Sequence, residues 1–169
     1  MLINKKIHHE ELPLGLSGNV EAVAAKLWLG RYYTVCSLYL SPSQVIQETD
    51  ITNLIDQLNG RYLLLGDMNA HHGLWGEPTE NRKGKIFADL LLNQDITLLN
   101  DNQKTHYSIQ HDTSTLIDLS IASPTSFPDF TASVVECRHG SDHHPIKIQK
   151  LATPEIGVPS LRFKIEKAD

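Results

Sequence analysis

The chain has 169 residues, with 15 Lys+Arg against 20 Asp+Glu, and a formal net charge of −5 at pH 7. This length predicts one domain, and 40% hydrophobic with 21% charged residues excludes a chain that is disordered as a whole. Two cysteines are too few for a disulfide framework, no apolar run could cross a bilayer, and the acidic balance argues against a broad basic face for nucleic acid. Because the start does not resemble a signal peptide, we expect a nuclear or cytoplasmic protein that is not secreted.

The apolar patterns predict more strands than helices. Short apolar and β-branched runs bounded by Gly, Pro or Asn indicate strands, and apolar residues spaced by three and four indicate helices. In chain order, we expect a strand at 2–7, a hairpin of strands 21–29 and 32–40, a helix at 51–58, a strand at 62–65, a helix at 84–92, and strands at 96–99, 116–122, 132–135 and 145–148. This order favours two packed sheets with helices outside them. Residues 1–150 are expected to form the domain and residues 151–169 a loosely ordered tail.

Acidic, amide and imidazole side chains gather at the ends of the predicted strands. Segment 66–72 (GDMNAHH) directly follows one buried strand, segment 140–145 (GSDHHP) directly precedes another, and Asp118 lies inside an apolar run. A rigid strand fixes the side chains at its end, while the adjoining loop admits a ligand. We therefore expect these side chains to converge on one rim of a sheet.

Hydrolysis of a phosphodiester is the chemistry that these residue types support best. Mg²⁺ held by a carboxylate and waters would neutralise the phosphate, and Asp142 is the candidate for that place. Asp118 and His143 would form a pair in which the carboxylate positions the imidazole. Asp67 and Asn69 would lie beside the attacking water, with the Asn amide as a donor to the developing charge. Each feature alone is more often turn chemistry or a surface pair, so the prediction depends on their occurring together.

Four ordered segments resemble one family. Segments 65–76 (LGDMNAHHGLWG), 114–119 (STLIDL), 140–146 (GSDHHPI) and 37–43 (SLYLSPS) are similar to signatures of the endonuclease domains of non-LTR (LINE-type) retrotransposons, with the jockey-like branch nearest. These domains belong to the endonuclease/exonuclease/phosphatase superfamily. The resemblance covers about residues 1–150. It implies the α/β fold class, as a four-layered αββα sandwich of two mostly antiparallel sheets, here incomplete at the N-terminus.

The resemblance also implies a role for each matching residue. The implied catalytic residues are Asp67, Asn69, Asp118, His143 and Tyr39, with Asp142 on the metal side. Asp67 would orient or deprotonate the water, or protonate the leaving oxygen, and Asn69 would stabilise the transition state. His143 and Tyr39 would contact the phosphate, although a strand tyrosine more often serves packing. The residues expected to contact DNA are His71, Trp75 and Arg82, and the first two would otherwise shape their loop.

Two features of the family are missing from the sequence. An Asn ends the family's first strand, and a Gln-Glu pair ends the next, whose Glu is the main Mg²⁺ ligand. Residues 47–49 (QET) have the sequence of this motif but lie at the start of a predicted helix. An acidic residue there is favoured by the helix dipole, so we reject these residues as the metal ligand. The chain therefore looks like an N-terminally truncated domain, and we expect greatly reduced or absent DNA cleavage.

Three functional hypotheses follow. The first is a Mg²⁺-dependent endonuclease that nicks target DNA for a retrotransposon-derived protein, impaired by loss of the N-terminal metal ligand. The second is a non-catalytic remnant with weak DNA binding. The third is a phosphatase of the same superfamily, against which the Asn-Ala-His-His and Trp-Gly run argues. In the first two, DNA is the partner, the protein is a monomer, and no membrane is involved.

Overall fold

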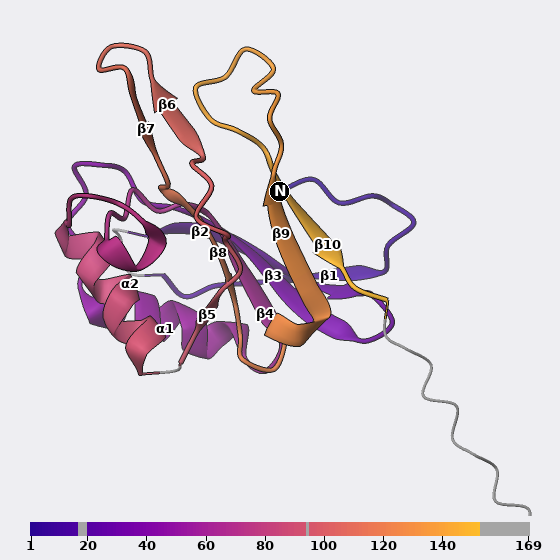
Figure 1. Ribbon diagram of the computed structural model, residues 1–169. Coiled ribbons are helices and arrows are strands. Elements are labelled where there is room, and N and C mark those ends of the chain that lie inside the picture. The colour runs from indigo at the N-terminus through magenta and orange to yellow at the C-terminus, as the bar shows by residue number, and fades with distance from the viewer. Residues whose placement is uncertain (17–19, 94, 153–169) are drawn as a thin grey trace, which may run out of the picture.

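The computed structural model describes residues 1–16, 20–93 and 95–152, and Figure 1 shows how their helices and sheets are arranged. The strands are β1 (His9–Leu12), β2 (Glu21–Trp28), β3 (Tyr32–Tyr39), β4 (Tyr62–Asp67), β5 (Thr97–Leu98), β6 (His106–Ser108), β7 (Thr113–Thr115), β8 (Asp118–Ala122), β9 (Phe130–Val134) and β10 (Ile146–Lys150). The helices are α1 (Glu48–Leu58) and α2 (Arg82–Leu92), with short 3₁₀ turns η1 (Gly73–Trp75) and η2 (Phe127–Asp129). Within these described ranges, no helix has the length and apolar character needed to cross a membrane.

One large sheet organises the molecule. Its six strands lie in the order β1-β2-β3-β4-β8-β5. β3 and β4 are parallel, with α1 between them in the chain, and the other neighbours are antiparallel. β9 and β10 form a second, antiparallel sheet, and β6 pairs with β7 in a separate hairpin. This confirms the predicted α/β fold with two mostly antiparallel sheets.

Alternate residues of the central strands face two different cores. In β4, Tyr62 and Leu64 belong to the core that packs against both α-helices, whereas Leu63 and Leu65 face β9 and β10. The helix side is the larger core. On the other side, the ring of Tyr33 packs edge-on against Phe130 with centroids 5.0 Å apart. The central strands of the large sheet are therefore buried on both faces, and apolar residues occupy most of their positions.

The predicted hairpin, both helices and most later strands are confirmed within a few residues. The strand predicted at 2–7 is wrong, because that segment forms a turn and β1 instead lies at His9–Leu12. β1 is mostly exposed and lacks an apolar alternation, so the hydrogen bonds of its pairing with β2 stabilise it rather than burial. The hairpin of β6 and β7 escaped prediction for the same reason. Of the predicted tail, residues 153–169 lie outside the described residues.

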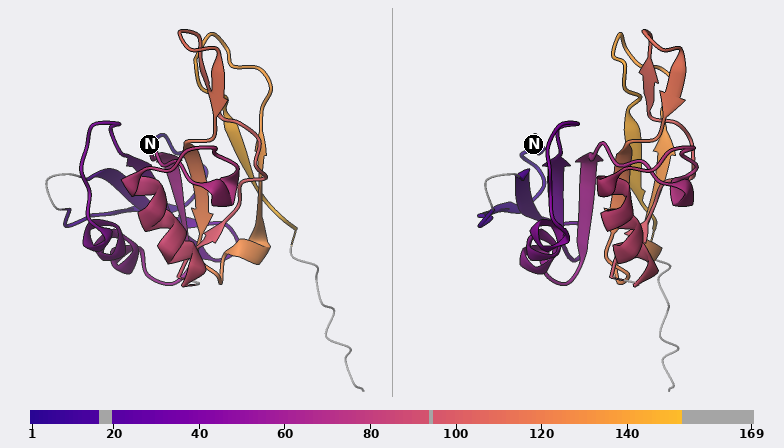
Figure 2. Two further views of the ribbon diagram at one scale, coloured as in Figure 1. Left: turned by 60° about the vertical axis from the view of Figure 1, so that its left-hand side comes forward. Right: turned by 90° about the vertical axis from the view of Figure 1, so that its left-hand side faces the viewer.

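Two segments project together from one end of the sheets. Both views of Figure 2 show the β6–β7 hairpin and the loop between β9 and β10 rising side by side. Backbone bonds join them, since the Tyr107 N–H donates to the Asp142 carbonyl at 2.8 Å and the His144 N–H donates to the Thr105 carbonyl at 2.6 Å. The segment that contains Ser-Asp-His is thereby held against a hairpin.

Candidate active site

Two aspartates on neighbouring strands form the centre of the site. Asp67 ends β4 and Asp118 begins β8, and the antiparallel register places them directly opposite each other. Alternate residues of a strand lie on the same face of a sheet, so Asp67 shares a face with Leu65 and Asp118 shares a face with Ser120. Both aspartate side chains therefore lie on the face directed towards β9 and β10. The predicted convergence of these two residues at one rim is therefore present.

The surroundings of Asp67 favour its protonated form. Burial raises the pKa of Asp67 and the negative charge of Asp118 raises it further, whereas His143 and the Asn69 N–H, which donates to Asp67 Oδ1 at 3.0 Å, lower it. The first two effects prevail. Asp67 thus holds a proton more readily than an ordinary carboxyl group, as expected for a group that exchanges protons during a reaction.

His143 and Asp118 form the predicted pair. The distance between His143 Nδ1 and Asp118 Oδ2 is 2.9 Å, and both side chains are partly exposed. A carboxylate at Nδ1 fixes the proton on that nitrogen, so the Nε2 lone pair remains available. Asp118 and His143 lie 25 positions apart in the sequence. The β6–β7 hairpin holds the segment that contains His143, and its own sequence has no pattern that predicts a hairpin.

Asn69 adopts a left-handed backbone conformation, with φ of 46°. Its Nδ2 donates to the Leu40 carbonyl at 3.0 Å, and its own carbonyl accepts from Asn81 Nδ2 at 2.8 Å. These bonds tie the end of β4 to the end of β3 and to the start of α2. The predicted contact of the Asn69 side chain with a phosphate stays a prediction.

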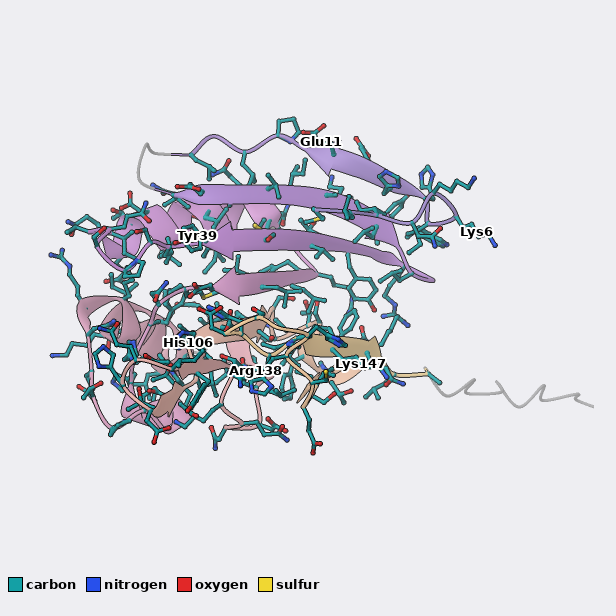
Figure 3. All side chains as sticks on the ribbon, turned by 90° about the horizontal axis from the view of Figure 1, so that it is seen from above. Lys6, Glu11, Tyr39, His106, Arg138 and Lys147 are labelled. Atoms are coloured by element: carbon teal, nitrogen blue, oxygen red, sulfur yellow. The ribbon has the colours of Figure 1, made fainter. Side chains whose placement is uncertain are left out.

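Tyr39 and Asp142 present exposed polar groups around the aspartates. Tyr39 ends β3 with 43% of its surface exposed, on the same face of the sheet as Asp67. The Asp142 side chain is 63% exposed and lies 3.8 Å from His106 Nε2. Figure 3 shows Tyr39 on the large sheet and His106 on the projecting hairpin. Their roles at a phosphate or metal remain predictions.

The three predicted DNA-contact residues differ in exposure. Trp75 is fully buried and its Nε1–H donates to the Ala70 carbonyl at 3.1 Å, so its side chain shapes the loop and has no surface to offer DNA. This corrects the DNA contact predicted for Trp75. His71 is partly exposed, with Nδ1 3.4 Å from Glu77 Oε2. Arg82 is exposed at the start of α2 and donates to Gln47 Oε1 at 2.5 Å.

The rejection of residues 47–49 as a metal ligand agrees with the structure. Gln47 is the N-cap of α1, its N–H donates to Asp50 Oδ2 at 2.9 Å, and Glu48 lies in the first turn of the helix. A carboxylate there is stabilised by the positive end of the helix dipole. The Gln-Glu-Thr sequence is therefore explained by its place at the start of helix α1.

Glu77 is a residue that the sequence analysis missed. Its side chain is fully buried, and its Oε1 accepts from the Leu116 N–H at 2.6 Å and from Lys104 Nζ at 2.7 Å. These bonds tie the loop after β4 to the segment leading into Asp118. No local pattern identifies such an acid, because Lys104 and Leu116 are distant from it in sequence.

We expect Glu77→Ala to lower the free energy of unfolding by about 2–4 kcal/mol, because it leaves the buried Leu116 N–H without its acceptor and removes the ion pair with Lys104. Urea denaturation monitored by circular dichroism measures the change. Glu80→Ala is the control, since Glu80 is exposed and pairs with His72 at 3.4 Å, a contact worth at most about 1 kcal/mol. Equal losses in the two variants would contradict the structural role of Glu77.

Lys83 and Gly84 begin α2 and pack tightly behind the site. Lys83 is buried, and its Nζ donates to the carbonyls of Ser41 and Pro42. Burial lowers the pKa of Lys83, whereas the charge of Asp67 raises it. A Cβ built on Gly84 would lie 1.8 Å from the His71 carbonyl oxygen. The helix start therefore touches the backbone of the Asn-Ala-His-His loop.

Gly84→Ala is consequently expected to destabilise the protein. In an open helix the same change would stabilise by about 1 kcal/mol, but here the methyl group overlaps a carbonyl and must displace the loop. We expect a loss of at least about 2 kcal/mol in urea denaturation. Lys85→Ala, at an exposed position of the same helix, is expected to change stability by less than about 0.5 kcal/mol. A gain in stability for Gly84→Ala would contradict the close contact.

Three described side chains could hold a metal ion together. His106, Asp142 and His143 each offer one ligand atom, and these atoms lie within 4.8 Å of one another. Asp67 and Asp118 add carboxylate oxygens on the adjoining sheet. The site thus combines acids, an oriented imidazole and an exposed tyrosine, a set of groups that suits attack of water on an anionic ester.

Comparison with known proteins agrees with this geometry. Residues 33–147 match the family described as Endonuclease-reverse transcriptase. The probable RNA-directed DNA polymerase from transposon BS of Drosophila melanogaster is 32% identical over 114 residues, covering 66% of this chain and 12% of that protein. The RNA-directed DNA polymerase from mobile element jockey of Drosophila melanogaster is 26% identical over 149 residues, covering 80% and 15%. The chain thus spans under a sixth of the length of these relatives.

Two solved structures share the fold. The endonuclease domain of TRAS1, a telomere-specific non-LTR retrotransposon, superimposes with a TM-score of 0.76 at 18% identity, covering 88% of this chain and 71% of that chain. An endonuclease/exonuclease/phosphatase family protein from Leptotrichia buccalis gives a TM-score of 0.55 at 12% identity, covering 78% and 53%. The fold is thus that of the TRAS1 endonuclease domain, and the matched family shows that the chain belongs to the endonuclease–reverse transcriptase family.

Proposed function

We propose that the chain is a Mg²⁺-dependent endonuclease that nicks target DNA for a retrotransposon-derived protein. The observation that carries this proposal is the arrangement of Asp67, Asp118 and His143, in which an imidazole positioned by one carboxylate lies beside a second carboxylate of raised pKa. Such an arrangement supports both charge stabilisation and proton transfer at a phosphate. The family match in the domain's later motifs supports the same reaction.

In this mechanism, water attacks the phosphorus and the bond to the leaving oxygen breaks. His143, held at Nδ1 by Asp118, acts as the imidazolium and donates its Nε2–H to a non-bridging phosphate oxygen. Asp67 takes a proton from the water or gives one to the leaving oxygen, and the Asn69 side-chain amide donates a hydrogen bond to the phosphate. Asp142, an exposed carboxylate of the kind that holds Mg²⁺ through oxygen and water, would bind the ion, whose charge would neutralise the phosphate.

We infer that the described residues hold Mg²⁺ weakly. Asp118 is committed to His143, and Asp67 is partly buried beside it, so Asp142 is the exposed carboxylate left for the ion. One carboxylate with waters is a minimal Mg²⁺ site. We therefore expect slow nicking by this chain and a requirement for high Mg²⁺ concentration.

Nicking of supercoiled plasmid by the purified 169-residue chain tests the proposal. We expect nicking in Mg²⁺ that is lost in EDTA and lost in Asp142→Ala. Asp89→Ala, at an exposed position of α2, is the control for effects of charge alone and should nick like the parent. Absence of nicking, or nicking that continues in EDTA, would overturn the proposal.

The second candidate function is DNA binding without cleavage, which the minimal metal site favours. His143→Ala separates the two functions. For an enzyme we expect nicking to fall by at least about 100-fold, because the positioned imidazole is lost. DNA affinity in a gel-shift assay should remain almost unchanged, since the substitution removes a single phosphate contact. DNA binding by parent and variant with no nicking by either would instead favour the binding function.

A further inference from the structure

We propose that His106, Asp142 and His143 form a binding site for Zn²⁺, which shares Asp142 with the proposed Mg²⁺ site and adds two imidazole ligands. The set combines two imidazole nitrogens with one carboxylate oxygen, and the ligand atoms lie within 4.8 Å of one another. His106 Nε2 is 3.8 Å from Asp142 Oδ2, and the two imidazole rings are 4.7 Å apart between centroids. The inference is independent of hydrolysis, because metal binding needs no bound DNA.

Both histidines have their inner nitrogen occupied and their outer nitrogen available. His106 Nδ1 lies 3.2 Å from Thr115 Oγ1, and His143 Nδ1 lies 2.9 Å from Asp118 Oδ2. When each Nδ1 carries the proton and donates it to that oxygen, each Nε2 lone pair is available to a metal. Hydrogen bonds of this kind orient metal-binding histidines and raise their basicity. The structure therefore supplies both the ligands and the groups that orient them.

The backbone holds the ligands near one another. His106 and His143 face each other in an isolated antiparallel bridge, and the Tyr107 N–H donates to the Asp142 carbonyl at 2.8 Å. The ligands thus come from two segments that are hydrogen-bonded to each other, shown where His106 is labelled in Figure 3. Little ordering of the backbone is required when a metal binds.

The donor set favours Zn²⁺ over Mg²⁺. Imidazole nitrogen suits Zn²⁺, whereas Mg²⁺ selects oxygen ligands in octahedral geometry. Tetrahedral bonds of about 2.0–2.1 Å place neighbouring ligand atoms about 3.4 Å apart. The ligand atoms must therefore approach by about 1.4 Å at most, and the exposed Asp142 side chain can rotate to allow this. Three protein ligands leave the fourth position to water.

Zinc titration of the purified chain, without DNA, tests the proposal. Competition with a chromophoric chelator should report one Zn²⁺ per chain, and millimolar Mg²⁺ should not displace it. His106→Gln and Asp142→Asn should each weaken binding by at least about 10-fold. His111→Gln is the matched control, since His111 is exposed in the turn of the same hairpin and outside the ligand set.

Cobalt substitution provides a second readout. Co²⁺ bound by the parent should give the visible absorption of a nitrogen- and oxygen-ligated ion, and His106→Gln should lose it while retaining the parent's circular dichroism. No stoichiometric Zn²⁺ binding, or an equal loss in His111→Gln, would overturn the proposal. Because the assays contain no DNA, zinc binding without nicking would leave this proposal standing, and nicking without zinc binding would leave only the proposed function.

Discussion

Asp67→Asn is expected to reduce plasmid nicking by at least about 100-fold and, at neutral pH, to raise the melting temperature of the protein. Nicking falls because an amide cannot exchange the proton that the mechanism requires. Stability rises because the ionised carboxylate is partly buried opposite Asp118, whereas Asn is neutral and keeps an oxygen that can accept from the Asn69 N–H. Groups that catalyse often reduce the stability of the fold that holds them.

The pH dependence of this stability difference has a definite sign. Because the pKa of Asp67 is raised in the folded protein, its stabilising contribution is complete below the ordinary value of 3.8 and is lost as the pH rises through the folded value. The melting temperature of Asp67→Asn relative to the parent should therefore be highest near pH 7 and decline towards pH 3. Thermal denaturation across this range measures it, with the exposed Asp89→Asn as control. A variant that is less stable than the parent at pH 7 would contradict the burial of charge at Asp67.

Gly66→Ala is expected to have the largest effect on folding. Gly66 lies in β4 with φ of 150°, and a Cβ there would be 1.8 Å from the carbonyl oxygen of Leu38 in β3. Relief of this overlap requires the two central strands to separate. We expect a loss of about 3 kcal/mol or more, which is a large part of the 5–15 kcal/mol that is typical of a whole domain.

Gly60→Ala separates the effect of the overlap from that of the backbone conformation. Gly60 also has a positive φ, of 66°, but a Cβ there would meet nothing within 4 Å. Its substitution should cost only about 1–2 kcal/mol. Urea denaturation of both variants measures the difference, and a Gly66→Ala variant as stable as Gly60→Ala would show that the strands are not in such close contact.

The parts of the site that could be predicted from sequence are those attached to apolar strands. Asp67 follows a run of four buried or half-buried residues, and Asp118 begins another, so the alternation of the strand determines their face. Backbone pairing then brings them together. The pairing of Asp118 with His143 needed the added knowledge of ordered family motifs, since periodicity does not relate residues of separate segments.

The parts that could not be predicted depend on contacts between distant segments. β1 and the β6–β7 hairpin are polar and gain their order from pairing rather than from burial. Glu77 and Lys83 read as surface charges, but the fold buries both against groups more than 25 positions away. The sequence suggests that Trp75 is an exposed aromatic residue in a loop, but its side chain is part of the hydrophobic core.

The direct opposition of Asp67 and Asp118 makes the strand register a condition of catalysis. A shift of β8 by one residue would turn Asp118 to the helix side of the sheet and leave Asp67 facing an isoleucine or a leucine. Such a chain could retain much of its secondary structure and still have no His143 partner at the rim. Nicking activity is therefore a more demanding report of correct folding than circular dichroism, since it is present only in the molecules whose central strands have paired without slippage.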